Sequence, residues 1–160
     1  LLIGVLSGSR DVLQPLSKIG IAGSTSVNSL KTDNAGMISY ASLPFRRVKT
    51  VAELDEIVRQ SNNQYLMVKF YADWCVSCKE MERFTLSDAQ VQARLEDVML
   101  LTIDVTEGNA DDMALLKRFS LFGPPGILFI DRQGNDIPDV RVIGFLNKND
   151  FLAVLNAILI

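Results

Sequence analysis

The only two cysteines of this 160-residue chain are Cys75 and Cys78, which are separated by Val76 and Ser77. They follow an apolar run at 65–71 and open a segment with the pattern of a helix. Two thiols at this spacing can do redox chemistry, because one attacks a disulfide and the second resolves the mixed disulfide. A disulfide between them would close only a four-residue loop, so it would do little to stabilise a fold. The pair is therefore more typical of thiol–disulfide chemistry than of a structural cross-link.

The rest of the composition excludes several other chemistries. The chain has no histidine, which removes Cys-His and Ser-His catalysis and most zinc sites. A zinc ribbon would need a second cysteine pair. The net charge of −3, with no cluster of lysine and arginine, argues against a nucleic-acid surface. We expect no metal and no diffusible cofactor, because the dithiol itself carries two electrons. A non-enzymatic copper(I)-binding module, with the ion held between two thiolates, is the alternative from a different class.

The first 45 residues carry no motif of their own. Leu1–Leu6 are apolar but far shorter than the ~20 residues that cross a bilayer. They fit the end of a transmembrane helix, the end of a signal peptide or an apolar arm equally well. Residues 7–45 are rich in small polar types and predict a flexible linker, although Met37–Tyr40 is strand-like. We therefore divide the chain into a leader and linker at 1–45 and a domain at 46–160.

From residue 46 onward, apolar periodicity predicts an α/β domain. Capping boxes at Thr50/Glu53 and at Ser87–Gln90 predict two helix starts. A crossover between two buried strands, followed by a hairpin, predicts a mixed sheet with helices on both faces. The predicted strands are 65–71, 98–105, 127–130 and 140–144, and the predicted helices begin near 51, 75, 88, 111 and 151.

This order of elements resembles the thioredoxin fold over residues 46–160, with Trp74 before the cysteines and a proline before the hairpin. The strings at 71–82, 85–88 and 123–129 make it similar to the C-terminal periplasmic domains of bacterial thiol:disulfide interchange proteins of the DsbD family. The resemblance implies a thioredoxin-like α/β fold and a redox-active Cys75–Cys78 disulfide. In that family the domain follows the last transmembrane helix, which would explain the apolar leader and the linker.

The resemblance also implies a function, a location and partners. The domain would receive electrons from the membrane domain of its own protein and reduce periplasmic partner disulfides, including that of an N-terminal domain, through transient mixed disulfides. It would lie in the periplasm as part of an inner-membrane protein. A free-standing periplasmic thioredoxin-like reductase, for instance one that serves cytochrome c maturation, is the enzymatic alternative. The direction of electron flow depends on the reduction potential, which no pattern in the sequence gives.

The position of the two cysteines predicts different roles for them. Cys75 lies at a helix N-terminus, where free backbone amides and the helix dipole favour a thiolate. We expect Cys75 to be the attacking sulfur. Cys78 lies on the same helical face within disulfide reach, points to the interior and would resolve the mixed disulfide.

Four further residues near the motif are candidates for a supporting role. By resemblance, a proline of this loop is the cis-proline that faces the cysteines, although it could simply mark a strand entry. We choose Pro125 rather than Pro124 because Pro125 immediately precedes Gly126 and the predicted strand. Trp74 would shield the disulfide and form part of a docking surface, or be a partly buried core aromatic. Asp73 and Tyr71 flank the motif, and Asp73 is expected to be solvated.

Lys69 is a departure from the family pattern, because thioredoxins and the DsbD domains commonly carry a buried aspartate at this position. A buried, unpaired ammonium is costly, so Lys69 is expected to pair with Glu82, with a route to the surface as the alternative. Glu82 lies one helical turn beyond Cys78 and could relay the resolving thiol's proton or simply be exposed. Our hypothesis is that Lys69 lowers the thiolate pKa of Cys75 relative to relatives with an acid there.

Overall fold

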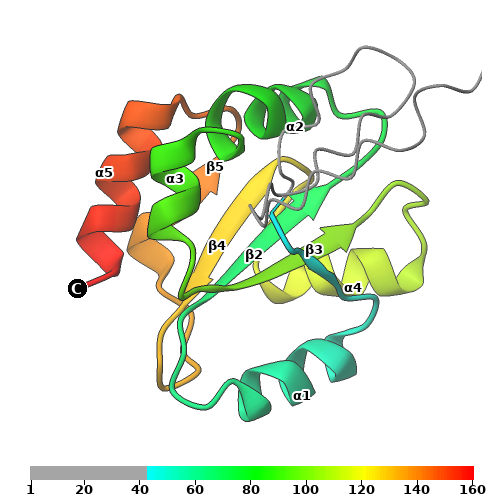
Figure 1. Ribbon diagram of the computed structural model, residues 1–160. Coiled ribbons are helices and arrows are strands. Elements are labelled where there is room, and N and C mark those ends of the chain that lie inside the picture. The colour runs from blue at the N-terminus through cyan, green and yellow to red at the C-terminus, as the bar shows by residue number, and fades with distance from the viewer. Residues whose placement is uncertain (1–42) are drawn as a thin grey trace, which may run out of the picture. The chain divides into compact units, whose positions relative to one another are not determined.

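The computed structural model describes residues 43–160, and it places a five-stranded sheet at the centre (Figure 1). The predictions for Leu1–Leu6 and Met37–Tyr40 lie outside the described residues. The strands occur in the order β1-β3-β2-β4-β5; β1, β3 and β2 are mutually parallel, and β4 and β5 are antiparallel to their neighbours. The expected mixed sheet is confirmed. The bounds are β1 Arg46–Arg47, β2 Leu66–Tyr71, β3 Met99–Asp104, β4 Gly126–Ile130 and β5 Val142–Ile143.

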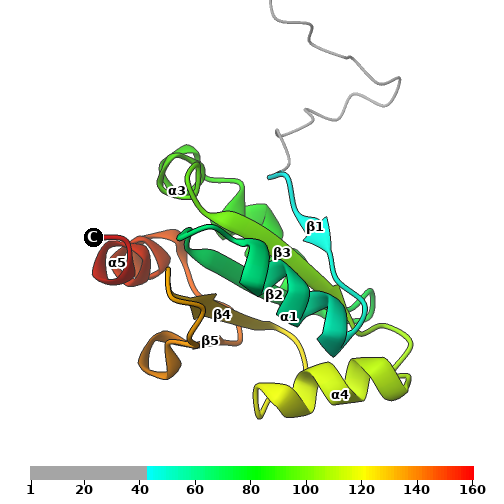
Figure 2. The same ribbon diagram turned by 90° about the horizontal axis from the view of Figure 1, so that it is seen from below.

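Helices cover both faces of the sheet (Figure 2). On one face, α1 and α4 bury their apolar residues against the sheet; on the other, η2, α3 and α5 do so. In the part of the chain that the structure describes, no helix is long and apolar enough to cross a membrane. The bounds are α1 Val51–Gln60, α2 Val76–Glu80, the π-helical η2 Met81–Leu86, α3 Ala89–Arg94, α4 Ala110–Arg118, the 3₁₀ turn η3 Pro138–Val140 and α5 Lys148–Ile158.

The central strand β2 places an ionisable group inside the molecule. Alternate residues of a strand point to opposite faces, and Val68 and Phe70 pack in the core under α1 and α4. Met67 packs in the core of the opposite face. Lys69 shares that second face by its position in the strand and is itself buried. An otherwise apolar strand therefore carries one charge that needs a partner.

The first predicted capping box forms only in part. Thr50 is the N-cap of α1, and its hydroxyl accepts a hydrogen bond from the Glu53 main-chain N–H at 3.1 Å. The Glu53 carboxylate does not return to Thr50, because it accepts from the Lys49 main-chain N–H at 2.9 Å. The helix start is where we expected it, with one of the two reciprocal bonds moved by one residue.

The second predicted capping box is wrong. The N-cap of α3 is Asp88, whose carboxylate accepts from the main-chain N–H groups of Gln90 at 2.9 Å and Val91 at 3.4 Å. Ser87 instead ends the preceding helix, because its hydroxyl donates to the Arg83 carbonyl. Of the two neighbouring side chains, the Asp88 carboxylate is the stronger hydrogen-bond acceptor, so it caps the start of α3. The Ser87 hydroxyl instead donates to a carbonyl that the end of the preceding helix leaves free.

Four other details depart from the sequence pattern. The helix after the cysteines widens into a π turn at Met81–Leu86, and the returning strand is only Val142–Ile143 because a 3₁₀ turn takes up Pro138–Val140. The edge strand β1 was not predicted. Leu43 and Phe45 also pack against the core, so the packed part of the chain begins before the expected boundary at 46.

Candidate active site

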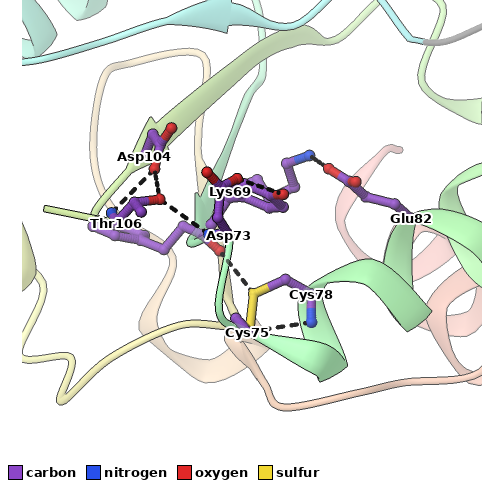
Figure 3. The surroundings of a disulfide bond; sticks show 9 residues. Lys69, Asp73, Cys75, Cys78, Glu82, Asp104 and Thr106 are labelled. Carbon is purple, nitrogen blue, oxygen red and sulfur yellow. Dashed lines mark hydrogen bonds and ion pairs between the residues drawn. A yellow bond between two sulfur atoms is a disulfide. The ribbon is translucent and has the colours of Figure 1, made fainter.

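The two cysteines form a disulfide at the start of α2, directly after β2 (Figure 3). Cys75 is the N-cap residue, and its Sγ accepts a hydrogen bond from the Cys78 main-chain N–H at 3.1 Å. Cys78 lies inside the helix, with its Sγ 4.0 Å from the Phe70 carbonyl oxygen. Both are buried, Cys75 at 6% and Cys78 at 3% exposure. The helix N-terminus thus directs an amide at the Cys75 sulfur, where it would favour a thiolate.

The proline loop belongs to the same end of the sheet. The Pro124–Pro125 peptide bond is cis, which confirms that Pro125 rather than Pro124 is the cis-proline. β4 begins at the next residue, and Gly126 pairs with Phe70, near the point where the cysteine segment leaves β2. The Pro125 carbonyl accepts from the Gly144 main-chain N–H at 3.1 Å, and Gly144 has a φ of 85°, which favours glycine. These pairings fix the loop beside the end of β2.

Trp74 and Asp73 lie at the surface beside the disulfide. The Trp74 side chain is 63% exposed, which excludes the alternative of a core aromatic, and its indole Nε1–H donates to the Thr106 carbonyl at 3.3 Å. Asp73 is exposed, as expected, and accepts from the Tyr71 hydroxyl at 3.0 Å. Burial raises the pKa of Tyr71, and the hydrogen bond to the Asp73 carboxylate raises it further. The phenol therefore stays a neutral donor at physiological pH.

Lys69 and Glu82 form an ion pair, so the expected partner is confirmed and the route to the surface is wrong. In Figure 3 the Lys69 ammonium points at the Glu82 carboxylate. Lys69 is 8% exposed, whereas the Glu82 side chain is 43% exposed. The ring of Phe45 lies 4.2 Å from Lys69 Nζ and the ring of Tyr71 lies 5.7 Å from it. The pair thus has one buried and one half-exposed member, with aromatic rings against the cation.

Two residues of this region were not identified from the sequence. Thr106 contacts both residues that precede Cys75, and Asp104 contacts Thr106. One signal could have indicated them, because β2 and β3 are parallel neighbours and polar residues lie at or just after the ends of both strands, at the same end of the sheet. Phe45 is a further neighbour of Lys69 that the sequence does not indicate, because it lies in the predicted linker at 7–45.

The described residues offer no alternative metal centre. Within residues 43–160, no group of three or more cysteine and carboxylate side chains is arranged to hold a metal ion. The expectation that the dithiol works without a metal or a cofactor stays a prediction, as does binding of copper(I) by the reduced thiols.

The fold and the paired cysteines agree with the sequence comparisons. The thioredoxin-like domain family matches residues 52–159, and the chain belongs to this family. Among the curated relatives, the thiol:disulfide interchange protein DsbD of Ralstonia nicotianae is 52% identical over 156 residues, which cover 96% of this chain and 24% of that protein. DsbD of Escherichia coli is 47% identical over 113 residues, or 71% of this chain and 20% of that protein.

Solved structures give the same assignment. The C-terminal domain of Neisseria meningitidis DsbD in the oxidised form matches with a TM-score of 0.57 and 32% identity, over 67% of this chain and 90% of that one. Its reduced form matches with a TM-score of 0.59 and 29% identity, over 71% and 99% of the two chains. The chain spans about a quarter or less of the full-length relatives and matches their C-terminal domain. It is a thioredoxin-like domain of the DsbD C-terminal type.

Proposed function

We propose that this domain relays electrons between a membrane domain of its own protein and disulfides of periplasmic partners. The observation that carries the proposal is the Cys75–Cys78 disulfide at the start of α2, in a chain 52% identical to a DsbD protein over nearly its whole length. Because those relatives are about four times longer, they contain other segments that could exchange with this one. A periplasmic, membrane-tethered location follows from the same resemblance and is part of the proposal.

The two cysteines, together with the partner disulfide, account for all the electrons and protons of the exchange reaction. In the reduced domain, the Cys75 thiolate attacks one sulfur of a partner disulfide, forms a mixed disulfide and releases the partner's other sulfur as a thiolate, which takes up a proton. Cys78 then loses its proton and attacks the Cys75 sulfur. The domain's disulfide forms, the second partner thiol leaves, and two electrons have passed to the partner. Reduction of the domain by its donor is the same sequence in reverse.

The surroundings of the two sulfurs support this order of attack. The Cys75 sulfur accepts a main-chain amide at the helix N-terminus, which stabilises negative charge. The Cys78 sulfur faces the Phe70 carbonyl oxygen, which can accept from a thiol but would repel a thiolate. Cys75 is therefore the nucleophile, and Cys78 stays protonated until the mixed disulfide has formed.

The Lys69–Glu82 pair would tune this chemistry. The Lys69 ammonium adds positive charge in the surroundings of the disulfide (Figure 3), so it would favour the Cys75 thiolate. The half-exposed Glu82 carboxylate could exchange the resolving thiol's proton with water. Trp74, largely exposed beside the disulfide, and the Pro125 loop would contact the bound partner. These roles are proposed together with the relay.

Trapping the mixed disulfide tests the relay. Cys78→Ser leaves the attacking thiol without its resolving partner, so Cys75 should remain covalently bound to a true partner. We expect this variant, mixed with the oxidised N-terminal domain of its own protein, to give one adduct on a non-reducing gel that dithiothreitol dissociates. Cys75→Ser, the matched control with a single remaining thiol, should give none.

The outcomes separate the candidate functions. If Cys78→Ser reacts with small disulfides but forms no adduct with either the N-terminal or the membrane domain, the relay is contradicted and a free-standing reductase is favoured. If the reduced wild-type chain retains copper(I) during dialysis and does not reduce any disulfide, the binding module is favoured instead.

A further inference from the structure

The two residues that precede the nucleophile are held by one residue of a neighbouring loop. Thr106 Oγ1 accepts a hydrogen bond from the Asp73 main-chain N–H at 3.0 Å, and the Thr106 carbonyl accepts from Trp74 Nε1–H at 3.3 Å. Asp104 Oδ1 in turn accepts from the Thr106 main-chain N–H at 3.0 Å and from its hydroxyl. We refer to these bonds among Asp73, Trp74, Asp104 and Thr106 as the Thr106 network; Figure 3 shows Asp73, Asp104 and Thr106.

The network acts on the turn that presents Cys75. The Cys75 main-chain N–H donates to the Ala72 carbonyl at 3.0 Å, so residues 72–75 form a β-turn with Asp73 and Trp74 as its two central residues. The central residues of a turn determine the direction in which the fourth residue leaves it. Thr106 bonds to both of them, through different atoms. The orientation of the nucleophile therefore depends on a residue outside its own segment.

The chemistry of the hydroxyl makes this contact directional. A threonine hydroxyl has one proton and two lone pairs. Since the proton is donated to Asp104, a lone pair remains for the Asp73 amide. The other Asp104 oxygen lies 3.5 Å from Arg47 Nη2 in an ion pair, so the carboxylate is itself oriented from β1. Arg47 therefore orients Asp104, Asp104 orients the Thr106 hydroxyl, and this hydroxyl orients the Asp73 amide.

The backbone gives this network a firm base. Tyr71 and Asp104 are paired in the parallel register of β2 and β3, and the Val105 main-chain N–H donates to the Tyr71 carbonyl at 2.8 Å. The two strands thus end side by side, and both loops begin from a hydrogen-bonded pair. The 72–75 turn can move relative to Thr106 only if hydrogen bonds of the Thr106 network break, whereas the hydrogen bonds between β2 and β3 can remain.

We propose that Thr106 is a positioning residue for thiol–disulfide exchange, which holds the 72–75 turn so that Cys75 and Trp74 meet the partner in a fixed geometry. The inference rests on the proposed exchange function. It adds a requirement that the cysteines alone do not impose, because a loosely held nucleophile reaches the in-line geometry for attack on sulfur less often.

The test compares three threonine variants of the full chain. Thr106→Val keeps the shape and removes the hydroxyl; Thr106→Ser keeps the hydroxyl. Thr102→Val is the matched control, because it makes the same change on β3 at a side chain that forms no hydrogen bond with any described residue. The first readout is the rate of oxidation of the reduced chain by oxidised glutathione, per thiolate. The second is the fluorescence anisotropy of Trp74, the only tryptophan of the chain.

We expect Thr106→Val to lower the rate per thiolate about tenfold and to lower the Trp74 anisotropy, since a small misplacement of reacting groups costs this much or more. Thr106→Ser and Thr102→Val should stay within about twofold of the wild type. An unchanged rate or an unchanged anisotropy in Thr106→Val overturns the inference, and so does an equal loss in Thr106→Ser. A wild-type chain that does not react with glutathione disulfide would overturn the exchange function, while the anisotropy still decides whether Thr106 holds the turn.

Discussion

Two polar groups of residues flank the cysteine segment, and they differ in the kind of interaction they use. Lys69 and Glu82 form an ion pair with the cation buried on a core face of the sheet. The Thr106 network consists mainly of hydrogen bonds to main-chain and indole groups at the exposed ends of β2 and β3. The first places formal charge near the chemistry and the second fixes the backbone. One region is therefore expected to control ionisation and the other geometry.

The two regions also differ in what their loss would cost. If the Glu82 carboxylate is removed, the buried Lys69 ammonium has no water that could take the place of its counter-ion. If the Lys69 ammonium is removed, the half-exposed Glu82 carboxylate can be hydrated. The hydrogen bonds of the Thr106 network lie near water, so their loss should change stability little. The comparison thus predicts separate responses in stability, thiol ionisation and reaction rate.

The largest expected effect is on stability, in Glu82→Gln. This change leaves the Lys69 ammonium buried without a counter-ion, and we expect the free energy of unfolding to fall by about 2 to 3 kcal/mol in urea titrations. Lys69→Met should cost less, at most about 1 kcal/mol, because methionine suits the buried position and Glu82 can be hydrated. Glu80→Gln, which removes an exposed carboxylate at the end of the adjoining helix α2, is the control. A larger loss in Lys69→Met than in Glu82→Gln would contradict the assignment of the buried member.

The next effect is on ionisation, in Lys69→Asp. Replacing a cation by an anion disfavours a nearby thiolate, so the pKa of Cys75 should rise. The pH dependence of alkylation of the reduced chain by iodoacetamide measures it. Thr106→Val, which changes no charge, should not shift the pH dependence of this alkylation. A Cys75 pKa that is unchanged or lower in Lys69→Asp would contradict the hypothesis that Lys69 stabilises the Cys75 thiolate.

The smallest effect concerns Asp131, in the turn after β4, and it separates stability from redox chemistry. Hydrogen bonds, first that from the Asn135 main-chain N–H, lower the pKa of Asp131. A lowered folded-state pKa means that the stabilisation is present above the ordinary aspartate pKa and is lost as the pH falls through the folded value. Asp131→Asn should cost about 1 kcal/mol at pH 7, by thermal or urea unfolding, and less in acid.

The exchange rate of Asp131→Asn should equal that of the wild type, because the turn is at the opposite end of β4 from the proline loop. A change in rate at equal stability would show that the charge pattern of the whole domain, rather than Lys69 alone, tunes the dithiol. A stability difference that grows in acid would contradict the sign given above.

Much of the fold could be predicted from the sequence, because its main strands are apolar runs and its helices are amphipathic. The Lys69–Glu82 pair could also be predicted, since a charge on a buried strand needs a partner within reach. The Thr106 network could not, because an Asp-x-Thr string has no specific meaning until the ends of two strands are placed side by side. The shift of a helix cap from Ser87 to Asp88 depends on competition between neighbouring residues, which a motif does not resolve. Phe45 was missed because its contact with Lys69 joins segments far apart in sequence.

The short outer strands of the sheet have a consequence for how the domain behaves in a crowded compartment. β1 and β5 contain two residues each, and β1 exposes Arg46 and Arg47. A long, flat and uncharged edge would invite strand addition by other chains, whereas a short edge with two cations offers few free backbone groups and repels its own copies. The sides of the sheet are thereby protected from strand addition by other chains, while the end that carries the cysteines is left open to contact.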